Sequence, residues 1–480
     1  LQLSYSLTRL GIEHAVISED PAPGGMFRRW PIFQRMLSWT KPYTGVPQTS
    51  RTYERYDWNS LIADEEKDRA LMTGLMDGTS YFPSRPEMER GLQTFAERTG
   101  IRVRYGCRWE STRRDAEGFT LGTSDGEYRS RLVVFAVGVA EPYRPPVPGL
   151  NGVPHYGELR PAPAYSDRRV FIIGKQNSAF EIATGLLPYA RQLILASPSP
   201  TRLSVNTRSL VGVRARYVQP YEDAALAGGV VILDATIEEV AIAGAGYRIR
   251  TGNPHGAAGL TFDADDVIAA TGFTAPLRDL PALGVATVGQ SKVPVQTPFF
   301  ESATARGIFF AGTISQGAPG LKKYGIPSNS GAVQGHRYNA RLLAQHLAET
   351  HFGRAPSRAA IDPASVVPML LADASHSPEL WHQRSYLARV VSVNPHGGAV
   401  DDGILPLAHF LDSSGPDAVS IALESNGKGD PYPAVYVRHR NVVSEHLLAP
   451  HPLLQFEGSE NAKALASALE PVLSRSASPA

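Results

Sequence analysis

The sequence predicts an α/β fold with two nested Rossmann-like dinucleotide-binding domains, followed by a C-terminal α+β accessory region. One observation is the stretch 170–181, where an apolar run enters a glycine turn at Gly174 and continues as a helix. A second is the order helix, strand and acidic residue over residues 1–19, which matches the second half of such a unit. A third is the change beyond Gly353 to Pro, Ser and scattered apolar residues. The boundaries that follow are a first domain at 1–150 and 276–353, a second domain at 151–275, and the accessory region at 354–480.

The charge balance and the single cysteine exclude several classes of protein. The formal net charge is only +1, with 47 Lys and Arg against 46 Asp and Glu, so we expect neither nucleic acid nor an anionic membrane as a partner. Cys107 is the only cysteine of the 480 residues, so no disulfide or C-x-x-C pair forms within the chain. The spacing of the histidines is not that of metal ligands, and we expect no metal site. No apolar run reaches the roughly 18 residues of a membrane span and no signal leader is visible, so we expect a cytoplasmic protein.

The first unit opens with an amphipathic helix at 1–11 and a strand at 14–18. Its first strand and glycine turn would lie upstream of Leu1, so we expect Leu1 and Gln2, at the helix start, to contact a dinucleotide. Without that turn, we expect the 480-residue chain to bind this dinucleotide poorly.

The middle of the first unit is irregular. Residues 31–84 are rich in aromatics, Pro and Arg, which predicts loops and short helices around a ligand. A helix follows at 85–99, and the expected strands and the linker are at 101–105, 119–123, 131–137 and 142–148.

The second unit carries the clearest turn. In it Gln176 stands at the third position of the G-x-G-x-x-G pattern, so the match is imperfect. The backbone N–H groups of Asn177 and Ser178 would hold a pyrophosphate at the helix N-terminus. Such a turn alone is more often a tight helix–strand contact, and the ordered series of turns carries the prediction. Later elements are expected at 192–196, 267–272, 307–313, 329–349, 386–393, 418–424 and 434–439, with a disordered tail at the end.

This order of motifs resembles the flavin-dependent monooxygenases of the two-dinucleotide-domain type, which include flavin-containing and N-hydroxylating enzymes. The resemblance covers roughly residues 1–350. It implies FAD in the first unit and NADPH, or NADH, in the second. The residues it places at these cofactors are Glu19 at the ribose, Gly24, Gly25, Met26 and Phe27 beside the pyrophosphate, Gly138, Thr271 and Gly272 at the interdomain strand ends, and Gly312 and Thr313 at the flavin. Trp30 is a candidate wall of the flavin pocket, although a tryptophan of this kind is more often ordinary core.

Two further motifs bear on the reaction. Asp265 with the following VIAATGF resembles a signature of the N-hydroxylating members, and the Baeyer–Villiger fingerprint is missing before residue 170. In the segment 53–61 the resemblance places Asn59 beside the flavin as the catalytic amide, although Asn59 could equally cap a helix beginning at Ser60.

The choice of NADPH requires a cation near the 2′-phosphate, just past the second strand of the unit. Ser197, Thr201 and Arg202 are candidates there with Arg208 behind them, although Arg202 could be a solvated loop residue.

The resemblance therefore implies a monooxygenase in which NADPH reduces FAD and O2 adds at flavin C4a before it oxygenates a heteroatom. The expected partners are O2 and a small amine-type substrate, and the chain could form a homo-oligomer. Two alternatives stay open: an FAD-dependent NAD(P)H oxidoreductase with a non-disulfide acceptor, and a flavin-binding redox sensor.

Overall fold

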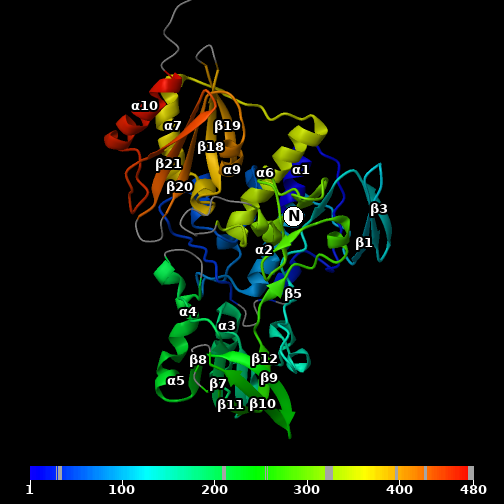
Figure 1. Cartoon of the computed structure of the whole chain (residues 1–480). Helices are drawn as coiled ribbons and strands as arrows, with labels where there is room; N and C mark the ends of the chain where they lie inside the picture. The colour runs from blue at the N-terminus through cyan, green and yellow to red at the C-terminus, as the bar shows by residue number, and fades with distance from the viewer. Residues whose placement is uncertain are drawn as a thin grey trace, which may run out of the picture. The chain divides into compact units, whose positions relative to one another are not determined.

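The structure is a computed structural model, and it describes residues 1–28, 30, 35–207, 212–253, 256, 258–318, 328–394, 398–425 and 430–473. The chain divides into two compact units (Figure 1). Unit 1 is Leu1–Gly25, Ser38–Gly138 and Leu277–Ala480, and unit 2 is Met26–Leu37 and Val139–Pro276. The second unit is therefore inserted in the first, as the nested α/β fold requires. The expected tail at 474–480 lies outside the described residues.

These units shift two of the expected boundaries. The main segment of unit 2 begins at Val139, where β5 (Glu141–Pro142) pairs with β13 (Phe273–Thr274), so the Pro-rich linker already belongs to this unit. The accessory region belongs to unit 1 rather than standing apart. Its Tyr386 and Leu387 share one apolar core with residues of α1, β16 and α6.

Unit 1 contains three longer helices before the accessory region: α1 (Gln2–Arg9), α2 (Arg85–Thr99) and α6 (Val333–Phe352). The α2 helix has the predicted limits because Ser84 and Glu87 form a capping box at its start and Gly100, with φ of 64°, ends it. The segment before α2 has short 3₁₀ helices, as expected: η1 (Gly25–Arg28), η2 (Arg51–Arg55), η3 (Glu66–Asp68) and η4 (Met72–Gly74).

The strands of unit 1 are short. An antiparallel sheet joins β1 (Trp109–Arg114), β2 (Phe119–Thr123) and β3 (Gly126–Ser130), while β4 (Val133–Phe135) pairs in parallel with β16 (Ile308–Phe310). The strands expected at 14–18 and 101–105 reduce to one parallel bridge, in which the Arg104 amide donates to Val16 at 2.8 Å and the Ser18 amide donates to Arg104 at 2.9 Å. A further small hairpin joins β14 (Thr287–Val288) and β15 (Val293–Pro294), flanked by η10 (Leu280–Leu283) and η11 (Gly312–Gly317).

The accessory region is a six-stranded antiparallel sheet in the order β17-β19-β18-β20-β21-β22. All residues of β20 are buried, because α7 and α10 share the core on the Val419 face and α9 shares the core on the Ala418 face. Strands β18, β20 and β21 were expected, whereas β19 and β22 were not. The bounds are β17 (Ala360–Ile361), β18 (Leu387–Val393), β19 (Ala399–Pro406), β20 (Ala418–Glu424), β21 (Tyr432–His439), β22 (Val442–Leu447), α7 (Pro363–His376), α8 (Pro378–His382), α9 (Leu407–Asp412) and α10 (Ser459–Leu473).

Unit 2 is built on a parallel sheet in the order β12-β6-β7-β8, with α3 following β6. Strand β6 is buried from Val170 to Ile173, as the continuous apolar run predicts for a parallel strand covered on both faces. The elements are β6 (Arg169–Ile173), α3 (Asn177–Leu186), β7 (Gln192–Ser197), α4 (Ala215–Val218), α5 (Glu222–Leu226), β8 (Val230–Asp234), β12 (Asp266–Ala269) and the antiparallel β9 (Thr236–Ala243), β10 (Gly246–Gly252) and β11 (Thr261–Ala264), with short 3₁₀ turns η5 (Leu150–Gly152), η6 (Tyr156–Glu158), η7 (Ala162–Tyr165), η8 (Ser204–Thr207) and η9 (Gln219–Tyr221).

Candidate functional site

The glycine turn of unit 2 lies where a dinucleotide site is expected, at the carboxyl end of β6. Gly174 has φ of 137°, and a Cβ atom there would lie 2.4 Å from the Ala270 carbonyl oxygen. Only glycine fits this close approach. Helix α3 then begins after Gln176, an exposed residue whose side chain does not cap the helix. The N–H groups of the first turn of α3 are thus available to bind an anion.

The side chain of Asn177 has a structural partner of its own. Its amide nitrogen donates to the Gly212 carbonyl at 3.0 Å, and its oxygen accepts from the Arg214 amide at 3.0 Å. Asn177 therefore holds the loop that returns toward α4, and only its backbone is free for the pyrophosphate role. The side chain of Ser178, the next residue, is half-buried.

Lys175 was not singled out from the sequence, yet it shapes this edge of the sheet. Its side chain is fully buried and forms an ion pair with Asp234, which ends β8 and is 40% exposed. In the sheet register Asp234 lies opposite Ser197, the last residue of β7. The Lys175 ammonium thus already has a carboxylate partner. Lys175 therefore links two strand ends and is not free to bind a phosphate.

Two of the residues proposed for a 2′-phosphate contact lie in the described part of the loop after β7. Arg202 is exposed, and its guanidinium makes no ion pair with a described residue. The Thr201 hydroxyl is buried with no hydrogen-bond partner in the part of the chain that the structure describes. Arg208 lies outside the described residues.

Thr271 and Gly272 lead from β12 into β13 and are hydrogen-bonded to Tyr143, the residue after β5. The Thr271 hydroxyl donates to the Tyr143 carbonyl, and the Tyr143 amide donates to the Gly272 carbonyl at 2.9 Å. His155, which is fully buried, packs edge-on against Phe273 at 5.2 Å, and its burial lowers the pKa of the imidazole. No sequence pattern indicated a buried neutral histidine beside this strand end.

Trp30, a candidate wall of the flavin pocket, packs against the core of unit 2, as the alternative interpretation expects. Its ring centre is 4.9 Å from that of Phe273 and 6.2 Å from that of Tyr156. Met26 and Phe27 belong to the same unit, whereas Gly24 and Gly25 end the first segment of unit 1 with φ of 136° and 50°.

In unit 1, two glycines follow parallel strands at one edge. Gly138 comes after β4 with φ of 71° and Gly312 after β16 with φ of 76°. A Cβ at Gly312 would meet no atom within 4 Å, so the backbone there faces open space that a planar cofactor can approach. Thr313 is half-buried beside it, and Glu19 is exposed. These residues fit the FAD that the resemblance implies.

Gln2 is occupied elsewhere. Its side-chain nitrogen donates to the Ile62 carbonyl at 3.0 Å, and its oxygen accepts from the Ile62 amide at 2.7 Å. Gln2 therefore anchors the segment after Asn59, while the half-buried Leu1 packs against the small core around Tyr5.

Asn59 lies in a buried polar cluster and is 1% exposed. Its amide nitrogen donates to the Thr40 hydroxyl at 2.9 Å and to the Ser38 carbonyl at 3.3 Å, and its oxygen accepts from the Ser38 hydroxyl. Both amide protons are thus used within the chain. No helix starts at Ser60, so the capping alternative is wrong; Asp57 accepts the backbone amides of Asn59 and Ser60 at 3.2 and 3.1 Å.

Arg337 of α6, another residue that the sequence did not reveal, holds this segment. Its guanidinium is buried and donates to the carbonyls of Ser60, Glu54 and Asp57 at 2.7, 2.8 and 2.9 Å. A charge that is solvated by several carbonyls fixes the path of the chain on which Asn59 lies.

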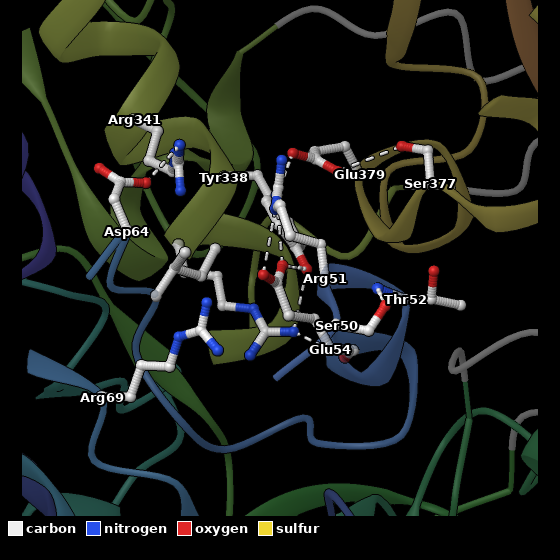
Figure 2. A network of polar contacts seen from close by, with 12 residues as sticks. Ser50, Arg51, Thr52, Glu54, Asp64, Arg69, Tyr338, Arg341, Ser377 and Glu379 are labelled. Carbon is white, nitrogen blue, oxygen red and sulfur yellow. Dashed lines mark hydrogen bonds and ion pairs between the residues drawn. The ribbon is translucent and has the colours of Figure 1, made fainter. Parts of the chain in front are cut away.

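Figure 2 shows how the accessory region joins this cluster, with Arg51 lying between Glu54 and Glu379. Burial opposes charge on both partners, but the Arg51–Glu379 pairing prevails: it raises the pKa of Arg51 and lowers the pKa of Glu379. The Tyr338 hydroxyl donates to Glu54 at 2.8 Å. Helix α8 therefore supports the segment that precedes Asn59.

Asp265, the first residue of the N-hydroxylating signature, has a structural role at the opposite end of the sheet. It lies just before β12 and accepts from the Arg169 amide and guanidinium, each at 2.8 Å, and this pairing lowers its pKa to about 2. The carboxylate is thus remote from the strand ends where the dinucleotide turn lies.

Cys107 is buried, and its thiol donates to Asp125 at 2.9 Å. Within the described residues no group of His, Cys, Asp and Glu is arranged to hold a metal ion. The described part of the chain also has no helix with the length and apolarity needed to cross a bilayer.

Comparison with known proteins gives one family and several relatives. The family described as pyridine nucleotide-disulphide oxidoreductase matches residues 1–312. The mouse protein named FAD-dependent oxidoreductase domain-containing protein 2 is 26% identical over 389 residues, which is 74% of this chain and 56% of the mouse protein. The chain thus spans about half the length of this relative.

Two solved structures have a similar fold. A bacillithiol disulfide reductase from Staphylococcus aureus superposes with a TM-score of 0.57 at 15% identity, over 73% of this chain and 95% of that one. A flavin-containing monooxygenase from Stenotrophomonas maltophilia gives 0.53 at 18% identity, over 72% and 94%. They confirm the nested two-domain α/β fold.

Proposed function

This chain belongs to the pyridine nucleotide-disulphide oxidoreductase family, and we propose that it is an FAD-dependent NAD(P)H monooxygenase acting on the nitrogen of a small amine or amino acid. When bound, FAD would take a hydride from NAD(P)H and pass the two electrons to O2. One oxygen atom then enters the substrate and the other leaves as water, with the heteroatom supplying the remaining two electrons.

The state of Cys107 is the observation that favours oxygen over a dithiol as acceptor. It is the only cysteine of the 480 residues, it is buried, and its thiol is bound to Asp125. Disulfide chemistry within one chain needs a pair of thiols, whereas the given sequence has Cys107 alone.

The chain's residues would divide the work between the two units. The N–H groups at the start of α3 would bind the pyrophosphate of NADPH, and Arg202 would bind its 2′-phosphate. Gly138, Gly312 and Thr313 would line the flavin. Asn59 would act as a positioning residue, because its amide is already bound to Ser38 and Thr40.

The use of both amide protons of Asn59 favours the second candidate, an FAD-dependent oxidoreductase with a non-disulfide acceptor. A redox sensor is its non-enzymatic counterpart. The test is to supply the protein with excess FAD, NADPH and ¹⁸O₂ and to screen a panel of primary amines by mass spectrometry. One ¹⁸O atom in a hydroxylamine product is the expected result. Release of all the oxygen as H2O2, with faster NADPH oxidation on addition of a quinone, would support the second candidate.

A further inference from the structure

Unit 1 has a concavity of about 520 Å³ that lies apart from the residues assigned to the cofactors. It lies at the amino ends of the parallel strands β4 and β16, whereas Gly138 and Gly312 follow their carboxyl ends. Its walls come from the β1–β2 turn, the residues before each strand and the last turns of α6. This volume is in the range of small-molecule sites.

Three arginines line the concavity: Arg114, Arg131 and Arg306. None of them forms an ion pair with a residue that the structure describes. The guanidinium of Arg114 lies 5.4 Å from the ring centre of Phe119, and that of Arg131 lies 5.1 Å from the ring centre of Phe352. Stacking on an aromatic ring holds a guanidinium in place while its N–H groups stay available.

Two of the three carboxylates that line the concavity accept hydrogen bonds from backbone amides. Asp115 accepts the amides of Glu117 and Gly118 at 2.8 and 3.0 Å, and Glu301 accepts the Gly307 amide at 2.7 Å. The carboxylate of Glu117, which is exposed, makes no hydrogen bond to a described residue. It is therefore the main competitor for an incoming anion.

The other walls include an apolar ring and an uncharged histidine. Phe119 is buried, and a Cβ at Gly307 would lie 2.9 Å from its ring. His346 stacks on Phe299 at 4.1 Å, and burial lowers its pKa to about 4, so its imidazole is uncharged at neutral pH. A ligand that combines an apolar part with a charge can therefore contact both kinds of wall.

We propose that this concavity is a second ligand site, which binds a small anion with an apolar body. The anion is a planar or tetrahedral oxyanion, a carboxylate or a phosphate monoester, whose oxygens the three arginines bind. This site is separate from the proposed reaction and does not depend on it.

The test is isothermal titration of the full chain with phenyl phosphate and with benzoate, and with benzyl alcohol as the uncharged probe. We expect at least one anion to bind in the micromolar to low millimolar range. The Arg114→Gln and Arg131→Gln variants should each weaken binding about tenfold, and Glu117→Gln should strengthen it. Binding of phenyl phosphate alone would assign the site to phosphates, and binding of benzoate alone to carboxylates.

Arg113→Gln is the matched control, because Arg113 is the neighbour of Arg114 but pairs with Glu127 outside the concavity. These surface changes should leave the melting temperature unchanged. The proposal is wrong if neither anion binds below 10 mM (on the order of 3 kcal/mol), if benzyl alcohol binds as well as the anions, or if Arg113→Gln weakens binding as much as Arg114→Gln.

Discussion

Replacing Arg337 with methionine should destabilise unit 1 more than any exposed change. The guanidinium donates to three carbonyls at 2.7 to 2.9 Å, and the side chain is almost fully buried. Each buried carbonyl left without a donor costs about 1–3 kcal/mol. The summed cost for the three carbonyls is offset in part, because methionine removes the cost of burying a charge. We therefore expect a loss of about 3 kcal/mol, the lower end of the sum for three groups.

The assay is urea unfolding followed by tryptophan fluorescence, since Trp39 and Trp58 lie in the supported segment at 5.9 Å from each other. Arg341→Met is the control from the next turn of α6, where the side chain is 26% exposed and pairs with Asp64 at 2.9 Å. That surface pair contributes at most about 1 kcal/mol. Equal losses for the two variants, or a loss below about 1 kcal/mol for Arg337→Met, would refute the assignment of Arg337 as the support of this segment.

Three other changes test unit 2. Gly174→Ala should weaken NADPH binding at least tenfold in a titration. Gly272→Ala should have a smaller effect, because a Cβ there would meet no atom within 4 Å. Equal effects of the two changes would contradict the close approach at Gly174. Arg202→Gln should raise the Kd for NADPH about tenfold and leave that for NADH unchanged, and a parallel loss for both would exclude a 2′-phosphate role. Asp265 has its pKa lowered by Arg169 to about 2 from 3.8, so its stabilisation is present above about pH 4 and disappears as the pH falls toward 2. At pH 7, Asp265→Asn should therefore be less stable than the parent in thermal unfolding, by under about 1 kcal/mol because the ion pair is partly exposed. Near pH 2 the two proteins should be equally stable. A difference in stability that persists at pH 2 would contradict the pairing.

Local signals predicted the elements whose stability is local. The limits of α2 followed from Ser84, Glu87 and Gly100, which lie within or next to the helix itself. The strands β6 and β20 are mostly apolar because both faces are covered. Strand β22 was missed because its residues are exposed or half-buried at a sheet edge, without a continuous apolar run.

The cofactor turns could be predicted in part from the sequence, and the buried polar networks could not. Gly174 could be identified because a strand, a glycine and a helix follow one another directly. The partner of Lys175 lies 59 residues away, so no local pattern indicates that its charge is neutralised. Trp30 lies within the first domain expected at 1–150, but the segment Met26–Leu37 belongs to unit 2, where the Trp30 ring packs against Phe273.

The sequence by itself determined the nested α/β class, the glycine turn of unit 2 and the lack of a cysteine pair, because these depend on composition and on neighbours along the chain. Only the tertiary structure decided what Asn59 and Arg337 do. Arg337 meets the carbonyl of Asp57 across 280 residues, and Glu379 of the accessory region meets Arg51 across 328. Contacts of this kind depend on how the helices and loops pack together, and burial makes each unpaired polar group costly enough to require them.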